Sequence, residues 1–97
     1  MDVSRFSHAA IAERVRHLVA RQMPAGCDIA SCHDDLSLGA SGVGLDSVAM
    51  VELVLACERE FTVRLPSDVI EATALTIESL TVAIERALPR AMRGPGV

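Results

Sequence analysis

Aromatic residues are scarce in this chain of 97 residues, and lysine is missing. There is no Trp and no Tyr, and the only aromatic residues are Phe6 and Phe61. All nine basic residues are Arg, and the formal net charge is -4. A nucleic-acid-binding surface needs clustered positive charge, so we expect no nucleic-acid partner. Hydrophobic residues make up 51% of the chain. Because so few of them are aromatic, we expect a core built mainly from Leu, Val, Ile, Ala and Met.

Long apolar runs are also missing. No stretch approaches the roughly 20 apolar residues that span a bilayer, and the N-terminal residues lack the shape of a signal peptide. We therefore expect a cytoplasmic, monomeric protein with no membrane partner. Cys27, Cys32 and Cys57 are an odd number without a secretory signal, which implies no disulfide framework. The length suffices for one small domain with one core, which we expect over residues 1–88.

Apolar residues at helical spacing predict an all-α fold. Three main helices and a short third helix are expected over residues 7–22, 47–61, 68–72 and 77–88. In the first helix, Ile11, Val15 and Leu18 fall on one face. Pro24 and Gly26 should close this helix.

The segments between and after these helices are uneven in length. A long connection, residues 24–46, should be pinned to the core by Leu36 and Leu38, and loops of this length are often functional. Ser67-Asp68 and Thr76 are expected to cap the third and last helices. Residues 89–97 show no periodicity and are predicted to be a flexible tail.

The most informative stretch runs from Gly42 to Leu53, where a glycine-rich loop meets the second helix. Asp46 and Ser47 are both good N-cap residues, because their side-chain oxygens accept hydrogen bonds from free backbone N–H groups. The positive end of the helix dipole lies beside the Ser47 hydroxyl, and helix N-termini favour anions such as phosphate. The alternative interpretation is an ordinary helix cap.

The order of the residues in this stretch is similar to the motif of a known protein family. Gly44-Leu45-Asp46-Ser47-Val48, followed by Val51-Glu52-Leu53 and Glu58-Arg59-Glu60-Phe61, resembles the acyl carrier protein family over roughly Leu36 to Leu88. The resemblance implies a four-helix bundle with a long loop between its first two helices. It also implies a non-catalytic carrier that holds acyl groups as thioesters on a 4′-phosphopantetheine arm.

In that family the arm is attached to the serine that corresponds to Ser47. A separate phosphopantetheinyl transferase takes it from coenzyme A, and acyl-loading and chain-processing enzymes are the further partners. The resemblance assigns Asp46 to capping and to engaging the transferase, and Val48 to contact with the transferase or the arm. Gly42 and Gly44 should leave the approach to the serine open.

The second helix carries two apolar stripes. One comprises Met50, Leu53, Val54, Cys57 and Phe61, and the other, nearly opposite, comprises Val48, Val51 and Leu55. We expect the first stripe to be buried and the second to be a protein-docking surface. The candidate partner-binding residues are Val51, Glu52, Leu55, Glu58 and Arg59. The alternative is that both stripes are buried.

Departures from the family pattern bear on the pathway. Fatty-acid carriers usually have an acidic residue where Ala49 stands and a glutamate where Arg59 stands, so attraction to basic enzymes should be weaker. This favours polyketide or related natural-product biosynthesis over fatty acid biosynthesis. Family members commonly have Gly where Thr62 stands, so the end of this helix should be less relaxed. A peptidyl or aryl carrier remains an alternative.

Other functions have less support in the sequence. An unmodified helical adaptor could use Val48, Val51 and Leu55 to bind a protein. A hydrolase using Ser47 lacks a nearby histidine in the sequence, and His33 alone does not argue for a catalytic triad. Cys27-x4-Cys32-His33 lacks the second pair of ligands usual in zinc sites, so we expect no metal.

Overall fold

Four helical segments form the described part of the chain, in the order α1 (His8–Gln22), α2 (Ser47–Phe61), α3 (Asp68–Glu71) and α4 (Ile77–Ala87). The computed structural model describes residues 6–23, 28–29, 32–39, 42–66, 68–71 and 75–89. These residues include no strand, and the all-α prediction is confirmed for them. The helix count of the whole chain and the full course of the loop between α1 and α2 remain predictions.

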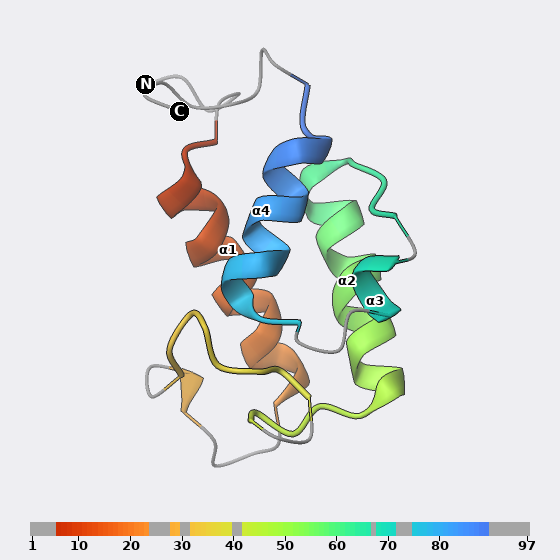
Figure 1. Cartoon of the computed structure of the whole chain (residues 1–97). Coiled ribbons are helices and arrows are strands. Elements are labelled where there is room, and N and C mark those ends of the chain that lie inside the picture. The colour runs from red at the N-terminus through yellow and green to blue at the C-terminus, as the bar shows by residue number, and fades with distance from the viewer. Residues whose placement is uncertain are drawn as a thin grey trace.

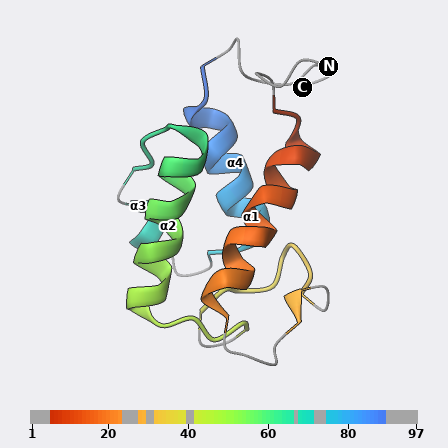
Figure 2. The ribbon, with the colours of Figure 1, turned by 180° about the vertical axis from the view of Figure 1, so that it is seen from behind.

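The three longer helices lie side by side. α4 lies between α1 and α2 in both views of the ribbon, and α3 lies against α2 (Figures 1 and 2). The faces that meet are apolar, and together they form one core. Its members are Ile11, Val15, Leu18, Val19, Leu38, Leu45, Leu53, Cys57, Phe61, Leu75, Ile77, Leu80, Ile84 and Leu88. At one end, the rings of Phe6 and Phe61 meet edge to face, with centroids 5.2 Å apart.

The ends of the helices follow from their capping residues. α1 begins at His8, one residue later than predicted, because Ser7 is the N-cap and its hydroxyl accepts a hydrogen bond from Ala10 N–H at 3.1 Å. It ends at Gln22 as predicted. Pro24 and Gly26 lie outside the described residues.

Thr76 caps α4 as predicted. It forms a reciprocal capping box with Ser79, whose Oγ accepts from Thr76 N–H at 2.8 Å. The helix ends at Ala87, one residue earlier than expected, because Leu88 has extended backbone angles and is the C-cap. α3 begins at Asp68 as predicted. Its expected last residue, Ala72, its expected cap Ser67, and the segment 90–97 lie outside the described residues.

Described parts of the connection between α1 and α2 are fastened to the start of α4. Leu38 is fully buried, as expected, and its N–H donates to Leu75 O at 2.8 Å. Leu36 is only half-buried. Ser37 and Thr76 form an isolated antiparallel bridge, and Glu78 N–H donates to Asp34 O at 2.9 Å. This segment therefore holds the approach to α2 against the bundle.

Arg16 fastens the same connection to α1, which the sequence did not reveal. Its guanidinium donates to the carbonyls of Ile29 and Cys32, at 3.0 and 2.7 Å, and to Asp34 Oδ1 at 2.7 Å. A guanidinium with several donors suits this task, because it satisfies backbone carbonyls and a carboxylate together. No described helix is both long and apolar enough to cross a membrane.

Candidate functional site

Ser47 is the first residue of α2 and is exposed to solvent. The residue before it, Asp46, is the N-cap: its Oδ1 accepts a hydrogen bond from Ala49 N–H at 2.8 Å, and its carbonyl accepts from Met50 N–H at 2.9 Å. Of the two cap candidates in the sequence, Asp46 therefore caps the helix. The Ser47 hydroxyl is left facing solvent beside the cap.

The electrostatics of this helix end favour an anion. The first N–H groups of a helix have no partner within it, and the helix dipole is positive there. Asp46 satisfies one of these donors through Ala49. A phosphate ester on the Ser47 hydroxyl would lie next to those that remain. The exposed serine and the adjacent helix N-terminus thus fit a phosphodiester attachment.

Two glycines shape the loop that leads to Ser47. One is required by its backbone angle and the other by a close contact. Gly44 has φ +93°, which side chains other than Gly rarely adopt, and a Cβ there would meet no atom within 4 Å. Gly42 packs directly on the chain, because a Cβ there would lie 2.0 Å from Ser37 O. The loop also ties back through Leu45 N–H, which donates to Leu38 O at 2.9 Å.

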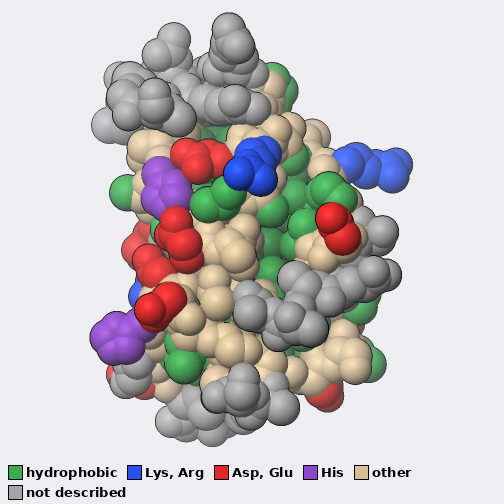
Figure 3. All heavy atoms as spheres, viewed as in Figure 1, with side chains coloured by type: hydrophobic (Ala, Val, Ile, Leu, Met, Phe, Trp, Pro, Cys, Tyr) green, Lys and Arg blue, Asp and Glu red, His purple; other side chains and the backbone are tan. Residues whose placement is uncertain are grey.

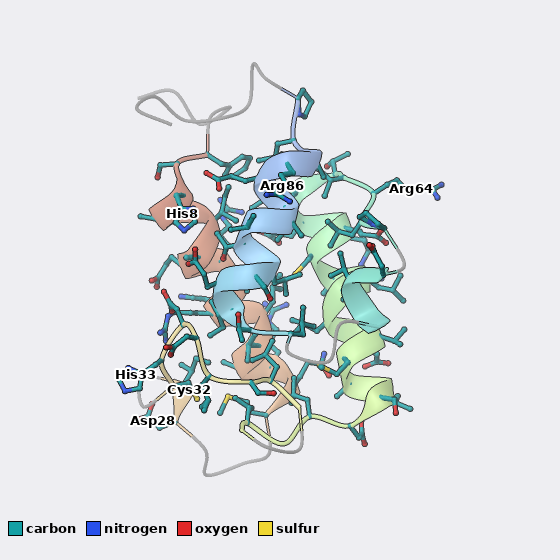
Figure 4. All side chains as sticks on the ribbon, in the orientation of Figure 1. His8, Asp28, Cys32, His33, Arg64 and Arg86 are labelled. Carbon is teal, nitrogen blue, oxygen red and sulfur yellow. The ribbon has the colours of Figure 1, made fainter. Side chains whose placement is uncertain are left out.

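None of the described histidines is hydrogen-bonded to the Ser47 hydroxyl. A hydrolytic serine needs a base within hydrogen-bond reach. His8 bonds to Glu78 and Glu85, and His17 bonds to Glu13. His33 lies in the connection and points away from the bundle (Figure 4). The described residues therefore form no Ser-His pair at Ser47.

The two apolar stripes of α2 have different surroundings, as predicted. Leu53, Val54, Cys57 and Phe61 are buried, and Met50 is half-buried. Val48 is 70% exposed, Val51 39% and Leu55 46%. The alternative that both stripes are buried is therefore wrong. An apolar stripe is open to solvent along the helix that begins at Ser47.

Cys57 belongs to the buried stripe and is a core residue. It is a free cysteine with no exposed surface, and burial, with the nearby Glu60 and Glu58, raises the pKa of its thiol to about 12. A thiol with such a pKa stays protonated near neutral pH and is a poor nucleophile.

The charged residues of α2 are in different environments. Glu58 is half-buried and accepts a hydrogen bond from Leu65 N–H at 2.7 Å. Glu60 forms an ion pair with Arg14, whose guanidinium carbon lies 5.5 Å from the centroid of the Phe6 ring. Glu52 and Arg59 are exposed. Glu58 is a predicted partner-binding residue, and its bond to the segment after the helix could not be predicted from its neighbours in the sequence.

Several surface grooves border the helices, and two of them differ in their lining. The groove between α1 and α2 is lined by Leu18, Arg21, Gln22, Glu52, Leu55, Ala56 and Arg59. The other lies between α4 and the segment leading into α3, and is lined by Arg64, Pro66, Asp68, Val69, Ala83, Arg86 and Ala87. Hydrophobic side chains with Arg on their margin are visible on this second face (Figure 3). Only the first groove includes a predicted partner-binding residue.

The region of Cys32 and His33 forms no metal site among the residues that the structure describes. No group of three or more His, Cys, Asp or Glu side chains is placed there to hold a metal ion. Cys32 is buried, with its Sγ 3.9 Å from Asp28 O, whereas His33 is exposed (Figure 4). Cys27 lies outside the described residues.

Comparison with known proteins gives one family. A family model described as the phosphopantetheine attachment site matches residues 13–84, which is most of the chain. The matched range contains Ser47 and all of α2. No solved structure matches the chain.

Proposed function

The chain belongs to the phosphopantetheine attachment-site family of carrier proteins, whose members carry a covalently attached 4′-phosphopantetheine group, and we propose that Ser47 is its attachment residue. The observation that carries the proposal is the exposed Ser47 hydroxyl at the N-terminus of α2, next to the Asp46 cap. Residues 1–88 would then be the carrier domain.

The residues around Ser47 have separate tasks in this proposal. Asp46 holds the first turn of α2 in place and presents a carboxylate to the transferase. Val48, with 70% of its surface exposed, offers an apolar contact to the transferase or to the arm. The backbone N–H groups of the first turn favour the phosphate ester. When bound, the arm supplies a terminal thiol on which an acyl group is held as a thioester.

Carriers of this family generally interact with phosphopantetheinyl transferases and acyl-processing enzymes. We propose that the exposed stripe of α2 is where such enzymes dock, with Val51 and Leu55 as its apolar contacts. The chain itself would be non-catalytic. In the described part of the chain no histidine is hydrogen-bonded to Ser47, which is compatible with a serine that another enzyme modifies.

The acyl type and the pathway belong to the same proposal. Gly44-Leu45-Asp46-Ser47 is closer to acyl carriers than to peptidyl carriers. Ala49 and Arg59 reduce the negative charge of α2, which favours polyketide or related natural-product biosynthesis. An aminoacyl or aryl cargo is the alternative, and competitive loading of the holo protein with malonyl, aryl and aminoacyl donors distinguishes the two.

The attachment is tested by the intact mass of the protein after incubation with coenzyme A, Mg²⁺ and a promiscuous phosphopantetheinyl transferase. We expect the mass to increase by one phosphopantetheine. A folded protein whose mass stays unchanged with several such transferases would overturn the proposal.

An unmodified helical adaptor is the second candidate, favoured by the exposure of Val48, Val51 and Leu55. It predicts no modification by any transferase, together with loss of partner binding in Val51→Asp. The mass measurement thus separates the two candidates before any partner is known.

A further inference from the structure

The acidic side chains in the second half of α2 are engaged within the protein. Glu58 is bonded to Leu65 N–H at 2.7 Å, and Glu60 is paired with Arg14. A carboxylate that is already bonded to a backbone N–H or to a guanidinium attracts an approaching protein surface less strongly than a free carboxylate does. The charge that this part of the helix offers to a partner therefore comes from other residues.

In the groove lined by Arg21, Glu52, Leu55 and Arg59, between α1 and α2, basic side chains outnumber acidic ones. Its exposed charged residues are Arg21 from α1 with Arg59 and Glu52 from α2. Within the described part of the chain, neither arginine has an ion-pair partner. Figure 2 shows the two helices side by side. The positive charge of the groove is thus available to a ligand.

The groove is continuous with the exposed apolar stripe. Leu55 belongs to both, and Leu18 and Ala56 add further apolar lining. A protein that covers Leu55 therefore also reaches the groove that Arg21 and Arg59 line. Burying a guanidinium without a counter-charge is costly, and the groove has one carboxylate, Glu52, against two arginines. A covering surface therefore gains by bringing carboxylates to these two positions.

We propose that this groove and the adjoining stripe bind a protein surface whose apolar centre is flanked by Asp or Glu. The proposal rests on the docking role given to the α2 stripe above, and it adds the polarity of the partner. Val51 and Leu55 contact the apolar centre of the partner, and Arg21 and Arg59 pair with its acidic flank. Glu52 lies in the same groove and would repel an acidic side chain placed against it, so the carboxylates of the partner must lie at the two arginines.

Two synthetic amphipathic helical peptides test this polarity. They share one apolar face of Leu residues and differ only in whether Glu or Lys flanks it. We expect the Glu-flanked peptide to bind roughly fivefold tighter by fluorescence anisotropy, which is the size typical of a few partly exposed ion pairs. The preference should shrink as salt is raised. Amide chemical shifts should move at Val51, Leu55 and Arg59.

Charge-reversal variants test whether the preference for the Glu-flanked peptide comes from the groove. Arg59→Glu should abolish or invert it, and Arg59→Gln should weaken it while leaving the fold intact by circular dichroism. Arg64→Glu changes the net charge by the same amount outside the groove, since Arg64 points away from the bundle, and should leave the preference unchanged (Figure 4).

Tighter binding of the Lys-flanked peptide, equal binding of both, or binding of neither would overturn the proposal. So would an equal effect of Arg64→Glu and Arg59→Glu. None of these results concerns the modification of Ser47, which the mass measurement reports separately. A protein that gains phosphopantetheine but prefers the Lys-flanked peptide is a carrier with a partner of the opposite polarity.

Discussion

Glu58 and Leu65 join the end of α2 to the segment that follows it, through a hydrogen bond of 2.7 Å from Leu65 N–H to Glu58 Oε2. The carboxylate is half-buried, and Val63 N–H donates to the carbonyl of the same residue at 3.1 Å. Both oxygen groups of Glu58 therefore hold the chain where it leaves the helix.

We predict that Glu58→Gln lowers the free energy of unfolding by about 1 kcal/mol and that Glu58→Ala lowers it by about 2 kcal/mol. The amide keeps an acceptor but loses the charge, whereas alanine leaves Leu65 N–H without a partner. Urea denaturation measures both values. Glu52→Gln, on the exposed face of the same helix, is the control and should change stability little. Equal effects at the two positions would contradict the structural role of Glu58.

The end of α2 is strained at Thr62, which has φ 55° and ψ 51° in the left-handed region. A β-branched residue is an outlier there, whereas Gly adopts this conformation without steric cost. We predict that Thr62→Gly raises the free energy of unfolding by about 1 kcal/mol, after allowing for the greater freedom of Gly in the unfolded chain. Thermal denaturation checks this, and a lower melting temperature for Thr62→Gly would argue against it.

The loop before Ser47 depends on Gly42 for space. We predict that Gly42→Ala destabilises the protein by about 2 kcal/mol or more, because the new Cβ would lie 2.0 Å from Ser37 O and the backbone must move. Gly39→Ala is the matched control, since its Cβ would lie at an ordinary 3.7 Å from Ser37 Oγ. Amide chemical shifts of Gly44 and Ser47 should move in the first variant and stay in the second.

His8 joins the start of α1 to α4 through two carboxylates. Its Nδ1 lies 3.0 Å from Glu85 Oε1 and its Nε2 lies 3.3 Å from Glu78 Oε1. Hydrogen bonds to Glu85 first and to Glu78 next raise the pKa of His8 above its ordinary value of 6.5. In Figure 4, His8 lies on the side of α1 near α4.

A raised pKa in the folded state means that the protonated form is favoured by folding. The stabilisation by His8 is therefore complete below pH 6.5 and is lost as the pH rises through the higher folded-state pKa. We predict that the stability difference between the native protein and His8→Gln shrinks as the pH is raised from 5 toward 8. An NMR titration of His8 should give a midpoint above that of an unstructured histidine. A midpoint below 6.5 would mean that folding lowers the pKa of His8, and it would refute the predicted loss of stability with rising pH.

The sequence predicted the helices well because their signals are local. The apolar spacing of α1, the Thr76 cap of α4 and the two stripes of α2 are each set by residues within a few turns. Helix ends differed by one residue where the choice of cap decides them, as at Ser7 and Leu88. The exposure of Val51 and Leu55 was predictable because a small bundle has no element left to cover a second stripe.

Long-range contacts were not predictable in this way. Arg16 bonds to carbonyls more than ten positions away, and Glu58 bonds to Leu65, on the segment after its own helix. A charged residue at an amphipathic boundary looks the same in sequence whether it faces solvent or a folded loop. Gly42 was expected to leave the site open, but the structure shows that its space is taken by Ser37.

Attachment of the phosphopantetheine arm to Ser47 is tested by comparing the native protein with Ser47→Ala in one transferase reaction with coenzyme A. Circular dichroism first establishes that the variant is folded, which the exposure of Ser47 favours. We expect one phosphopantetheine on the native protein, located on the Ser47 peptide by tandem mass spectrometry, and none on Ser47→Ala. Modification of folded Ser47→Ala, or an adduct on any other residue of the native protein, would contradict it.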